Sequence, residues 1–148
     1  MPQSLACLQV HFVFSTKNRL PLISPELATR LYSYIGGIAR DNKSVLLCAG
    51  GMPDHVHLLV SMSREVSASE MMRLVKSNSS KWIHEECPDI KDFGWQAGYG
   101  AFSVSFSATP TVKEYIARQE EHHAKQPFQD EFRALLRKHE IPFDERYV

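Results

Sequence analysis

The chain has 148 residues, enough for one domain that buries a hydrophobic core without help from a metal or a disulfide. Its 17 lysines and arginines balance its 17 aspartates and glutamates, so the overall charge does not indicate a polyanionic partner. The widely spaced cysteines, Cys7, Cys48 and Cys87, contain no C-x-x-C pair, which argues against a disulfide framework and a thiolate zinc site. We expect a single domain over residues 1–148.

The N-terminal stretch MPQSLACLQVHFVF has neither the cationic start nor the uninterrupted apolar run of a signal peptide. No later segment approaches the ~20 apolar residues of a membrane span. Together with the unpaired cysteines, these features predict a soluble cytoplasmic protein that has no membrane partner.

The first part of the chain predicts a strand, a helix and a hairpin. Residues 8–14 place apolar side chains alternately on one face, as in a half-buried strand. Ser24 is a good N-cap for a helix at about 25–40, with proline and glutamate in its first turn. The run SVLLCAGG, 44–51, predicts a second strand, and HVHLLVSM, 55–62, predicts its antiparallel return.

The remainder predicts a helix, a strand and two further helices. Ser67 and Glu70 form a capping box that opens a helix ending near residue 85. After a loop rich in glycine and aromatic residues, AFSVSFS predicts a fourth strand at 101–107. Thr109, followed by proline, is the predicted cap of a helix containing TVKEYIARQEEHH, and FQDEFRALLRKH predicts a last amphipathic helix.

The predicted order through the fourth strand is β-α-β-β-α-β, the split βαβ arrangement. The expected fold class is therefore α+β, with a ferredoxin-like antiparallel sheet, two covering helices and additional C-terminal helices. In such a fold, one sheet face is covered by the two helices and the other is free for a site.

Two histidines stand close together in the stretch PDHVHLLV. Side chains alternate along a strand, so His55 and His57 point to one face while Val56, Leu58 and Val60 point to the other. If the apolar side chains face the helices, the imidazoles share the uncovered face, where two neutral rings suit a divalent metal. Alternatively, each ring hydrogen-bonds to neighbours on a solvated sheet face.

Tyr115 and Gln119 lie four residues apart in the third predicted helix and therefore share one helical face. Taken alone, this pair is compatible with a core stripe, a solvent-facing stripe or a functional site. The run H55-V56-H57, the later Y115-x-x-x-Q119 and the GYGAFSVS ahead of the tyrosine resemble the HUH single-tyrosine transposases of the insertion sequence 200-like family. The resemblance extends in order and spacing from the first strand to about residue 125.

The resemblance implies that His55, His57 and Gln119 bind a divalent metal, Mg²⁺ or Mn²⁺, and that Tyr115 is the nucleophile. A free phenol has a pKa near ~10 and needs help to attack at neutral pH. A metal on the phosphate neutralises developing charge and aligns the displacement. The implied reaction cleaves and rejoins single-stranded DNA at hairpin-bearing ends, through a 5′-phosphotyrosine and a free 3′-hydroxyl.

The resemblance also implies a homodimer in which the tyrosine helix of one subunit completes the histidine site of the other. The sequence leaves open whether Tyr115 works within its own chain. Mobility around the fourth strand would come from Gly94, Gly98 and Gly100, although turn-making is their simpler role. His122 and His123 either assist at the metal or end the helix, and His11 either faces the same sheet face or has a core role.

Contact with DNA is a further expectation. Basic side chains placed to hold phosphates are Lys17, Arg19, Arg73, Lys76 and Lys81, and Trp82, Trp95 or Tyr99 would stack on unpaired bases. The alternative is a solvated basic face and aromatic residues in the core. Three other functions stay open: a domesticated relative acting on chromosomal palindromes, a non-catalytic nucleic-acid-binding module of the same fold, and a metal-dependent hydrolase.

Overall fold

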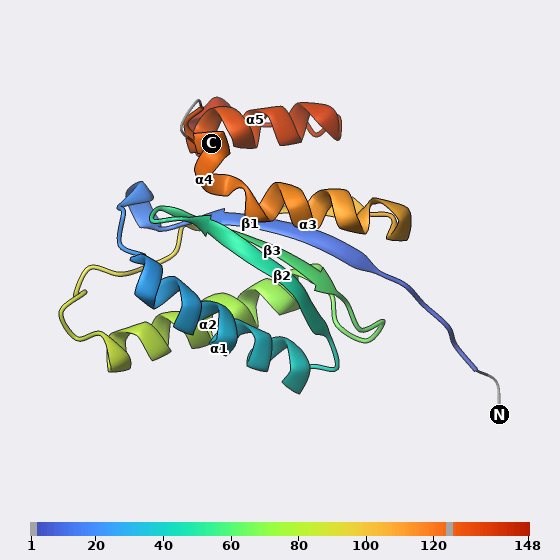
Figure 1. Cartoon of the computed structure of the whole chain (residues 1–148), viewed down its shortest axis with the longest axis horizontal. Coiled ribbons are helices and arrows are strands. Elements are labelled where there is room, and N and C mark those ends of the chain that lie inside the picture. The colour runs from blue at the N-terminus through green and yellow to red at the C-terminus, as the bar shows by residue number, and fades with distance from the viewer. Residues whose placement is uncertain (1–2, 124–125) are drawn as a thin grey trace.

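Four antiparallel strands form the centre of the computed structural model, which describes residues 3–123 and 126–148 (Figure 1). The strand order is β2-β3-β1-β4, as in a ferredoxin-like sheet. The strands are β1 (Gln9–Ser15), β2 (Val45–Met52), β3 (His55–Ser61) and β4 (Gly100–Val104). The helices are α1 (Pro25–Asp41), α2 (Ala68–Glu86), α3 (Thr109–Ala117), α4 (Gln119–His123) and α5 (Phe128–Lys138), and three short 3-10 turns lie at Lys17–Arg19, Phe106–Ala108 and Glu145–Tyr147. The predicted α+β class is confirmed.

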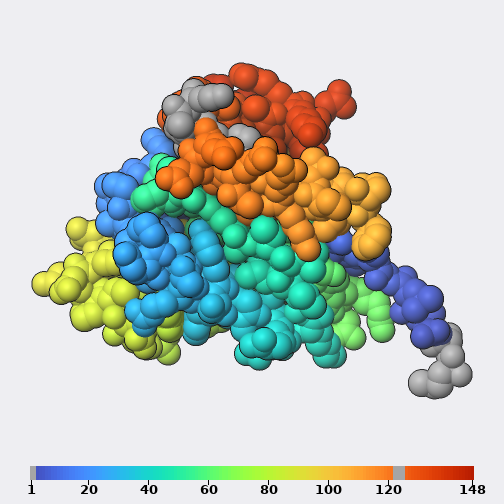
Figure 2. Space-filling view, in the orientation of Figure 1, coloured from blue at the N-terminus to red at the C-terminus, as the bar shows by residue number. Residues whose placement is uncertain are grey.

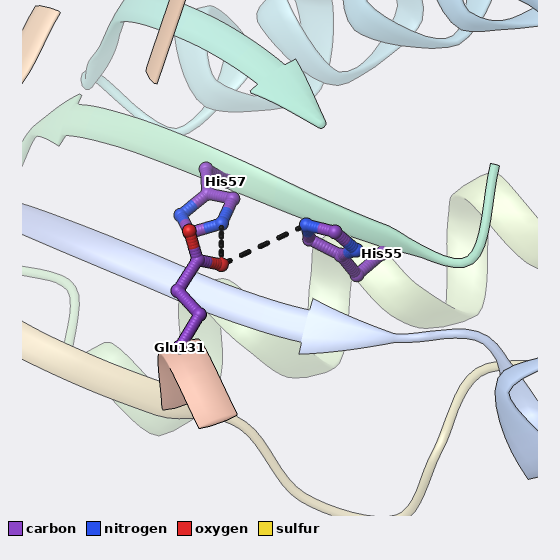
Figure 3. A group of neighbouring side chains, drawn as sticks. All are labelled: His55, His57 and Glu131. Atoms are coloured by element: carbon purple, nitrogen blue, oxygen red, sulfur yellow. Dashed lines mark hydrogen bonds and ion pairs between the residues drawn. The ribbon is translucent and has the colours of Figure 1, made fainter. Parts of the chain in front are cut away.

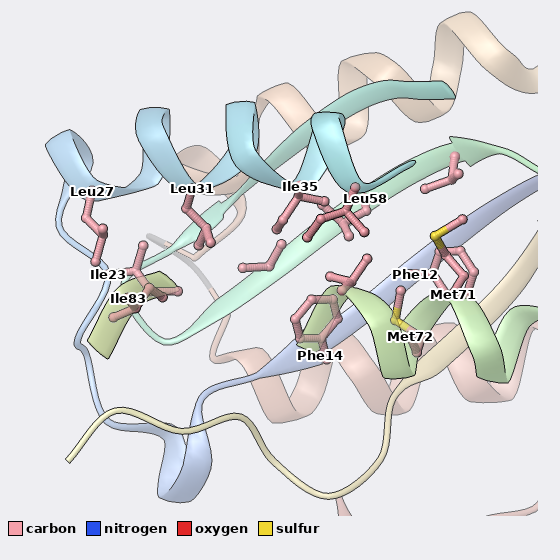
Figure 4. Close-up of a cluster of buried hydrophobic side chains, with 14 of the residues drawn as sticks. Phe12, Phe14, Ile23, Leu27, Leu31, Ile35, Leu58, Met71, Met72 and Ile83 are labelled. Atoms are coloured by element: carbon pink, nitrogen blue, oxygen red, sulfur yellow. The ribbon is translucent and has the colours of Figure 1, made fainter. Parts of the chain in front are cut away.

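Helices α1 and α2 cover one face of the sheet and enclose the main core (Figure 4). Alternation along β1 sends Phe12 and Phe14 to this face, and alternation along β3 sends Leu58 there. They meet Leu31 of α1 and Met71 of α2, and all five side chains are fully buried. The predicted split of β3 into an apolar face and a histidine face is therefore correct.

The opposite face of the sheet is covered as well, which corrects the expectation of a face free for a site. Helices α3, α4 and α5 lie on it, and Figure 2 shows these C-terminal segments packed directly against the strands. A second core joins Val13 of β1, Phe102 of β4 and Phe128 and Leu136 of α5. Strand β1 is consequently buried on both faces and is not the half-buried strand expected from its alternation.

The helix starts are set by side chains that accept backbone N–H groups. Ser24 Oγ accepts from Leu27 at 3.2 Å, which confirms the predicted cap of α1. Ser67 Oγ accepts from Glu70 at 3.1 Å at the start of α2. The Glu70 carboxylate binds the Arg73 guanidinium at 2.6 and 2.9 Å instead of returning to the cap.

The chain after β4 departs from the predicted boundaries. The strand ends at Val104 because the next residues turn into the 3-10 segment that leads directly into α3. Thr109 is the first residue of α3 and does not cap it; its hydroxyl donates to Gln9 Oε1 at 2.5 Å. The predicted helix over 111–123 is interrupted at Arg118, whose φ of −100° and ψ of 25° end α3 before α4 begins.

In the part of the chain that the structure describes, no helix combines the length and the apolar character needed to cross a bilayer.

Candidate active site

Three histidines lie together on the sheet face that α3, α4 and α5 cover. His55 and His57 of β3 are fully buried, and His11 of the neighbouring strand β1 is 4% exposed. His11 Nε2 lies 2.8 Å from His57 Nδ1, and the two rings stack with their centroids 5.0 Å apart. The antiparallel pairing of β1 with β3 brings them into contact, so His11 does face the same side as the histidine pair.

A glutamate from α5 occupies the space between the two β3 histidines (Figure 3). Glu131 Oε1 lies 3.0 Å from His57 Nε2 and 3.8 Å from His55 Nε2. The side chain is 4% exposed, and a buried carboxylate of this kind requires such partners. His55, His57 and Glu131 together form a cluster whose ligand atoms lie within 4.8 Å of one another, which suits a divalent ion.

Sequence reasoning missed Glu131, although the sequence contains a signal for it. The apolar residues of the last helix, Phe128, Phe132, Leu135 and Leu136, recur at helical spacing, and Glu131 falls within this same stripe. A charged side chain on the apolar face of an amphipathic helix is buried when the helix docks, so it needs a partner there.

His55 is oriented by groups on both sides of its ring. Its Nδ1 lies 2.7 Å from Asp54 Oδ1, so this nitrogen carries the proton that the carboxylate accepts. In the neutral ring, Nε2 then presents a lone pair, and it lies 3.0 Å from Gln119 Oε1, which is also an acceptor. Two converging acceptors repel each other unless a cation or a proton lies between them. A carboxylate behind a ligating histidine is the usual support of a metal site.

His11 can support His57 in the same way. Burial and, next in size, the neighbouring His57 lower the pKa of His11 to about 3, so its ring is neutral at physiological pH. A neutral His11 has one ring nitrogen that accepts a hydrogen bond. With His57 Nδ1–H donating to His11 Nε2, the His57 Nε2 lone pair points at Glu131 Oε1, 3.0 Å away, and a metal held by both atoms would relieve this contact.

Tyr115 and Gln119 complete the cluster from the side of α3 and α4. The Tyr115 hydroxyl donates to Glu131 Oε2 at 2.5 Å, and Gln119 Nε2 donates to the same oxygen at 3.1 Å. Gln119 is 2% exposed, whereas Tyr115 is half-buried. Burial, followed by the hydrogen bond and charge of Glu131, raises the pKa of the Tyr115 phenol well above its ordinary value. The structure thus brings together all four residues predicted as ligands and nucleophile.

Helix α3 reaches this position because β2 has a glycine beneath it. A Cβ atom on Gly50 would lie 2.5 Å from the backbone oxygen of Ile116 and 2.9 Å from its Cγ2. Ile116 directly follows Tyr115, so the close contact fixes the height of the tyrosine above the sheet. Gly100 in β4 has a similar packing role, because a Cβ there would lie 2.6 Å from Phe132.

A cavity of about 340 Å³ lies beside Tyr115. Tyr115 and His11 contribute to its wall, as do Lys138 and His139 at the end of α5. Tyr115 thus borders a cavity, whereas His55 and His57 are fully buried.

The five predicted DNA-contacting cations fall into two groups, one beside the histidine pair and one on α2. Lys17 and Arg19 follow Thr16, whose N–H donates to the Asp54 carbonyl at 2.9 Å, so this basic turn begins beside the histidine pair. Helix α2 carries the other three on the opposite side of the sheet: Arg73, Lys76 and Lys81.

Lys76 is engaged within the fold. Its ammonium donates to the carbonyls of Gln96, at 2.9 Å, and Gly98, and burial lowers its pKa to about 8. The predicted stacking residues also have partners: Trp82 stacks on Tyr34 with centroids 5.0 Å apart, and Trp95 packs against Phe14 and Phe93 in the core, at 4.8 and 4.9 Å. The roles considered for His122 and His123 fall outside the side chains that the structure describes.

Comparison with known proteins gives the family of the chain. A family model described as "Transposase IS200 like" matches residues 4–119. The ISDra2 transposase TnpA of Deinococcus radiodurans is 26% identical over 117 residues, which cover 76% of this chain and 84% of that protein. The transposase for insertion sequence element IS200 of Salmonella typhimurium is 27% identical over 115 residues, with 74% of each chain covered.

Two solved structures share the fold. One is a protein of Deinococcus radiodurans R1 assigned as a transposase, with a TM-score of 0.66, 24% identity, and coverage of 80% of this chain and 98% of the other. The second is a REP-associated tyrosine transposase bound to a REP hairpin, with a TM-score of 0.61, 15% identity, and coverage of 83% and 72%. With a family match over most of its length, the chain belongs to the IS200-like transposase family.

Proposed function

We propose that this chain is a metal-dependent transposase that cleaves and rejoins single-stranded DNA at hairpin-bearing ends through a 5′-phosphotyrosine intermediate. Membership of a transposase family implies an enzyme that cuts and transfers DNA. The finer mechanism is supported above all by the position of Tyr115, whose hydroxyl shares the Glu131 carboxylate with His57, one of a pair of fully buried histidines.

The donor set fits a divalent metal. His55 and His57 would hold it through Nε2 and Gln119 through Oε1, and we propose Mg²⁺ or Mn²⁺ because the nearby Glu131 adds a hard oxygen donor. When bound, the metal supplies positive charge to the scissile phosphate. Asp54 and His11 hold the two imidazoles in the orientation that directs Nε2 toward the site.

Tyr115 would attack the phosphorus in line with the departing 3′ oxygen, and the 3′-hydroxyl would later reverse the step to rejoin the strand. The cavity beside the phenol provides the approach, and Lys138 in its wall offers a positive charge to the DNA backbone. Lys17 and Arg19 are proposed phosphate contacts beside the site, and Arg73, Lys76 and Lys81 are proposed as a more distant part of the DNA path.

The homodimer stays part of the proposal. Strands β2 and β4 are the sheet edges at which two copies would join. Within one chain, Tyr115 lies against the site built by the same chain's His57, with ring centroids 5.8 Å apart. We therefore propose that the tyrosine acts in the chain that carries it, whatever the number of subunits.

The test is a denaturing gel of purified protein incubated with labelled single-stranded hairpin DNA and Mg²⁺ or Mn²⁺. A covalent protein–DNA band is expected that requires the metal and disappears in Tyr115→Phe, whereas Tyr147→Phe, at a residue 75% exposed, retains it. His57→Ala is expected to abolish cleavage and leave hairpin binding nearly intact. Binding without an adduct in the wild-type protein, across several hairpins and both metals, would favour the non-catalytic DNA-binding module.

A further inference from the structure

We infer that Glu131 is the group that accepts the proton of Tyr115 when the phenol oxygen attacks the DNA. This inference rests on the proposed function and adds to it a catalytic residue from α5. Residue 131 lies beyond the stretch matched by the family model, which ends at residue 119. The role therefore follows from the contacts of this chain.

The two carboxylate oxygens of Glu131 face different partners. Oε2 accepts the hydroxyl hydrogen of Tyr115 at 2.5 Å, a direct hydrogen bond of the kind that a general base needs to the proton it takes. Oε1 faces the Nε2 atoms of His57 and His55. One side chain thus contacts both the nucleophile and the nitrogens that would hold the metal, so a single helix position determines how the phenol lies relative to the metal.

The imidazoles near Tyr115 are less suited to take its proton. His57 lies edge-on to the tyrosine ring, and its two nitrogens face Glu131 and His11. His11 Nε2 is in turn engaged by His57. Because Glu131 is 4% exposed, its carboxylate receives the proton directly from the phenol and not through bulk solvent.

The helix that carries Glu131 is anchored against the site. The ring of Phe128, one turn earlier, stacks on His55 with centroids 4.3 Å apart. Phe128 and Leu136 both belong to the second core together with Val13 and Phe102 of the sheet. A carboxylate held by a docked helix keeps its place relative to the phenol, as a preorganised catalytic group must.

Atoms and charge balance over the step. As the bond from the Tyr115 oxygen to phosphorus forms, the O–H bond breaks and Glu131 takes the proton. The bond from phosphorus to the 3′ oxygen breaks, and the electron pair leaves with that oxygen, which lies opposite Tyr115 in the in-line displacement and takes a proton from water to give the 3′-hydroxyl. Glu131 then releases its proton to water, and rejoining runs through the same transfers in reverse, so no acid or base is consumed overall.

The experiment compares Glu131→Gln with Asp130→Asn, which makes the same change of charge on an exposed neighbour in α5. Adduct formation is timed on single-stranded hairpin DNA at saturating Mn²⁺. Glu131→Gln is expected to lower the rate by about 100-fold or more, the contribution typical of a general base, and Asp130→Asn to leave it near the wild-type value. Calorimetric titration with Mn²⁺ alone shows for each variant that the metal still binds.

A second measurement separates proton transfer from a structural role. Difluorotyrosine at position 115 has a more acidic phenol, which ionises with less help. In the Glu131→Gln variant, this replacement is expected to raise the rate of adduct formation at least tenfold. A Glu131→Gln variant as fast as wild type, a faster one, or one that binds Mn²⁺ but gains nothing from difluorotyrosine would each overturn the inference. Absence of any adduct with the wild-type protein would instead refute the proposed function, and the inference with it.

Discussion

Replacing Gly50 with alanine tests how the sheet positions Tyr115. Gly50 lies opposite His57 in the pairing of β2 with β3, and α3 passes directly over it. The added Cβ would lie 2.5 Å from the Ile116 carbonyl oxygen, a backbone atom that cannot rotate away. The substitution therefore requires either that α3 rises from β2 or that the strand bends.

Both responses lower the stability of the protein and displace Tyr115. Inserting a methyl group into a packed interface usually destabilises a protein by about 1–3 kcal/mol. A shift of about 1 Å at a reacting group typically costs on the order of 100-fold in rate. Because Tyr115 precedes Ile116, we expect Gly50→Ala to lower the free energy of unfolding by about 1–3 kcal/mol and to slow adduct formation by about 100-fold.

The matched control is Gly36→Ala in α1. A Cβ on Gly36 would lie 3.7 Å from Leu46 Cδ2, an ordinary contact, and alanine in a helix interior is favoured over glycine by about 0.5–1 kcal/mol. Urea unfolding followed by circular dichroism measures both variants, and the covalent-adduct gel measures activity. If Gly50→Ala is as stable and as active as wild type, or if Gly36→Ala is equally damaging, the steric reasoning is refuted.

Three further predictions concern the core, the α2 lysine and the origin of the tyrosine. Leu31→Ala, at a fully buried position, is expected to cost about 2–5 kcal/mol in urea unfolding, whereas Leu5→Ala, at 82% exposed, should match wild type. The pKa of Lys76 is lowered to about 8 by burial, so between pH 8 and 10.5 the unfolded lysine binds a proton that the folded one has lost. The free energy of unfolding of wild type relative to that of Lys76→Met should therefore rise with pH over that interval. A difference that does not change with pH would contradict this expectation. If each copy uses its own tyrosine, as proposed, mixing His57→Ala with Tyr115→Phe should restore no cleavage; recovered cleavage would mean that the tyrosine acts in the partner.

The sequence was sufficient to predict which way the histidines point. Alternation in β3 is a local property, since successive side chains in any strand take opposite faces. With Val56 and Leu58 directed into the core, His55 and His57 had to share the other face. The order of strands and helices followed in the same way from capping residues and periodicity, which depend on neighbours in the sequence.

The covering of that second face was not predictable by the same means. The apolar stripe of α5 predicted that one face of the helix is buried, but such a stripe does not reveal which surface the helix packs against. Only the docked helix brings Glu131 between His55 and His57. The break between α3 and α4 was also missed, because no proline or glycine marks Arg118; the two helices instead separate where Gln119 turns into the site.

The position of β1 at the centre of the sheet has a consequence for when the enzyme becomes active. This strand is synthesised first, yet its two neighbours, β3 and β4, come from much later in the chain. Pairing between distant segments slows folding, because long loops must close before the contacts form. The surface that receives α5 exists only after those strands have assembled. We therefore expect a nascent copy to be unable to cut DNA until α5 has left the ribosome and docked on the sheet.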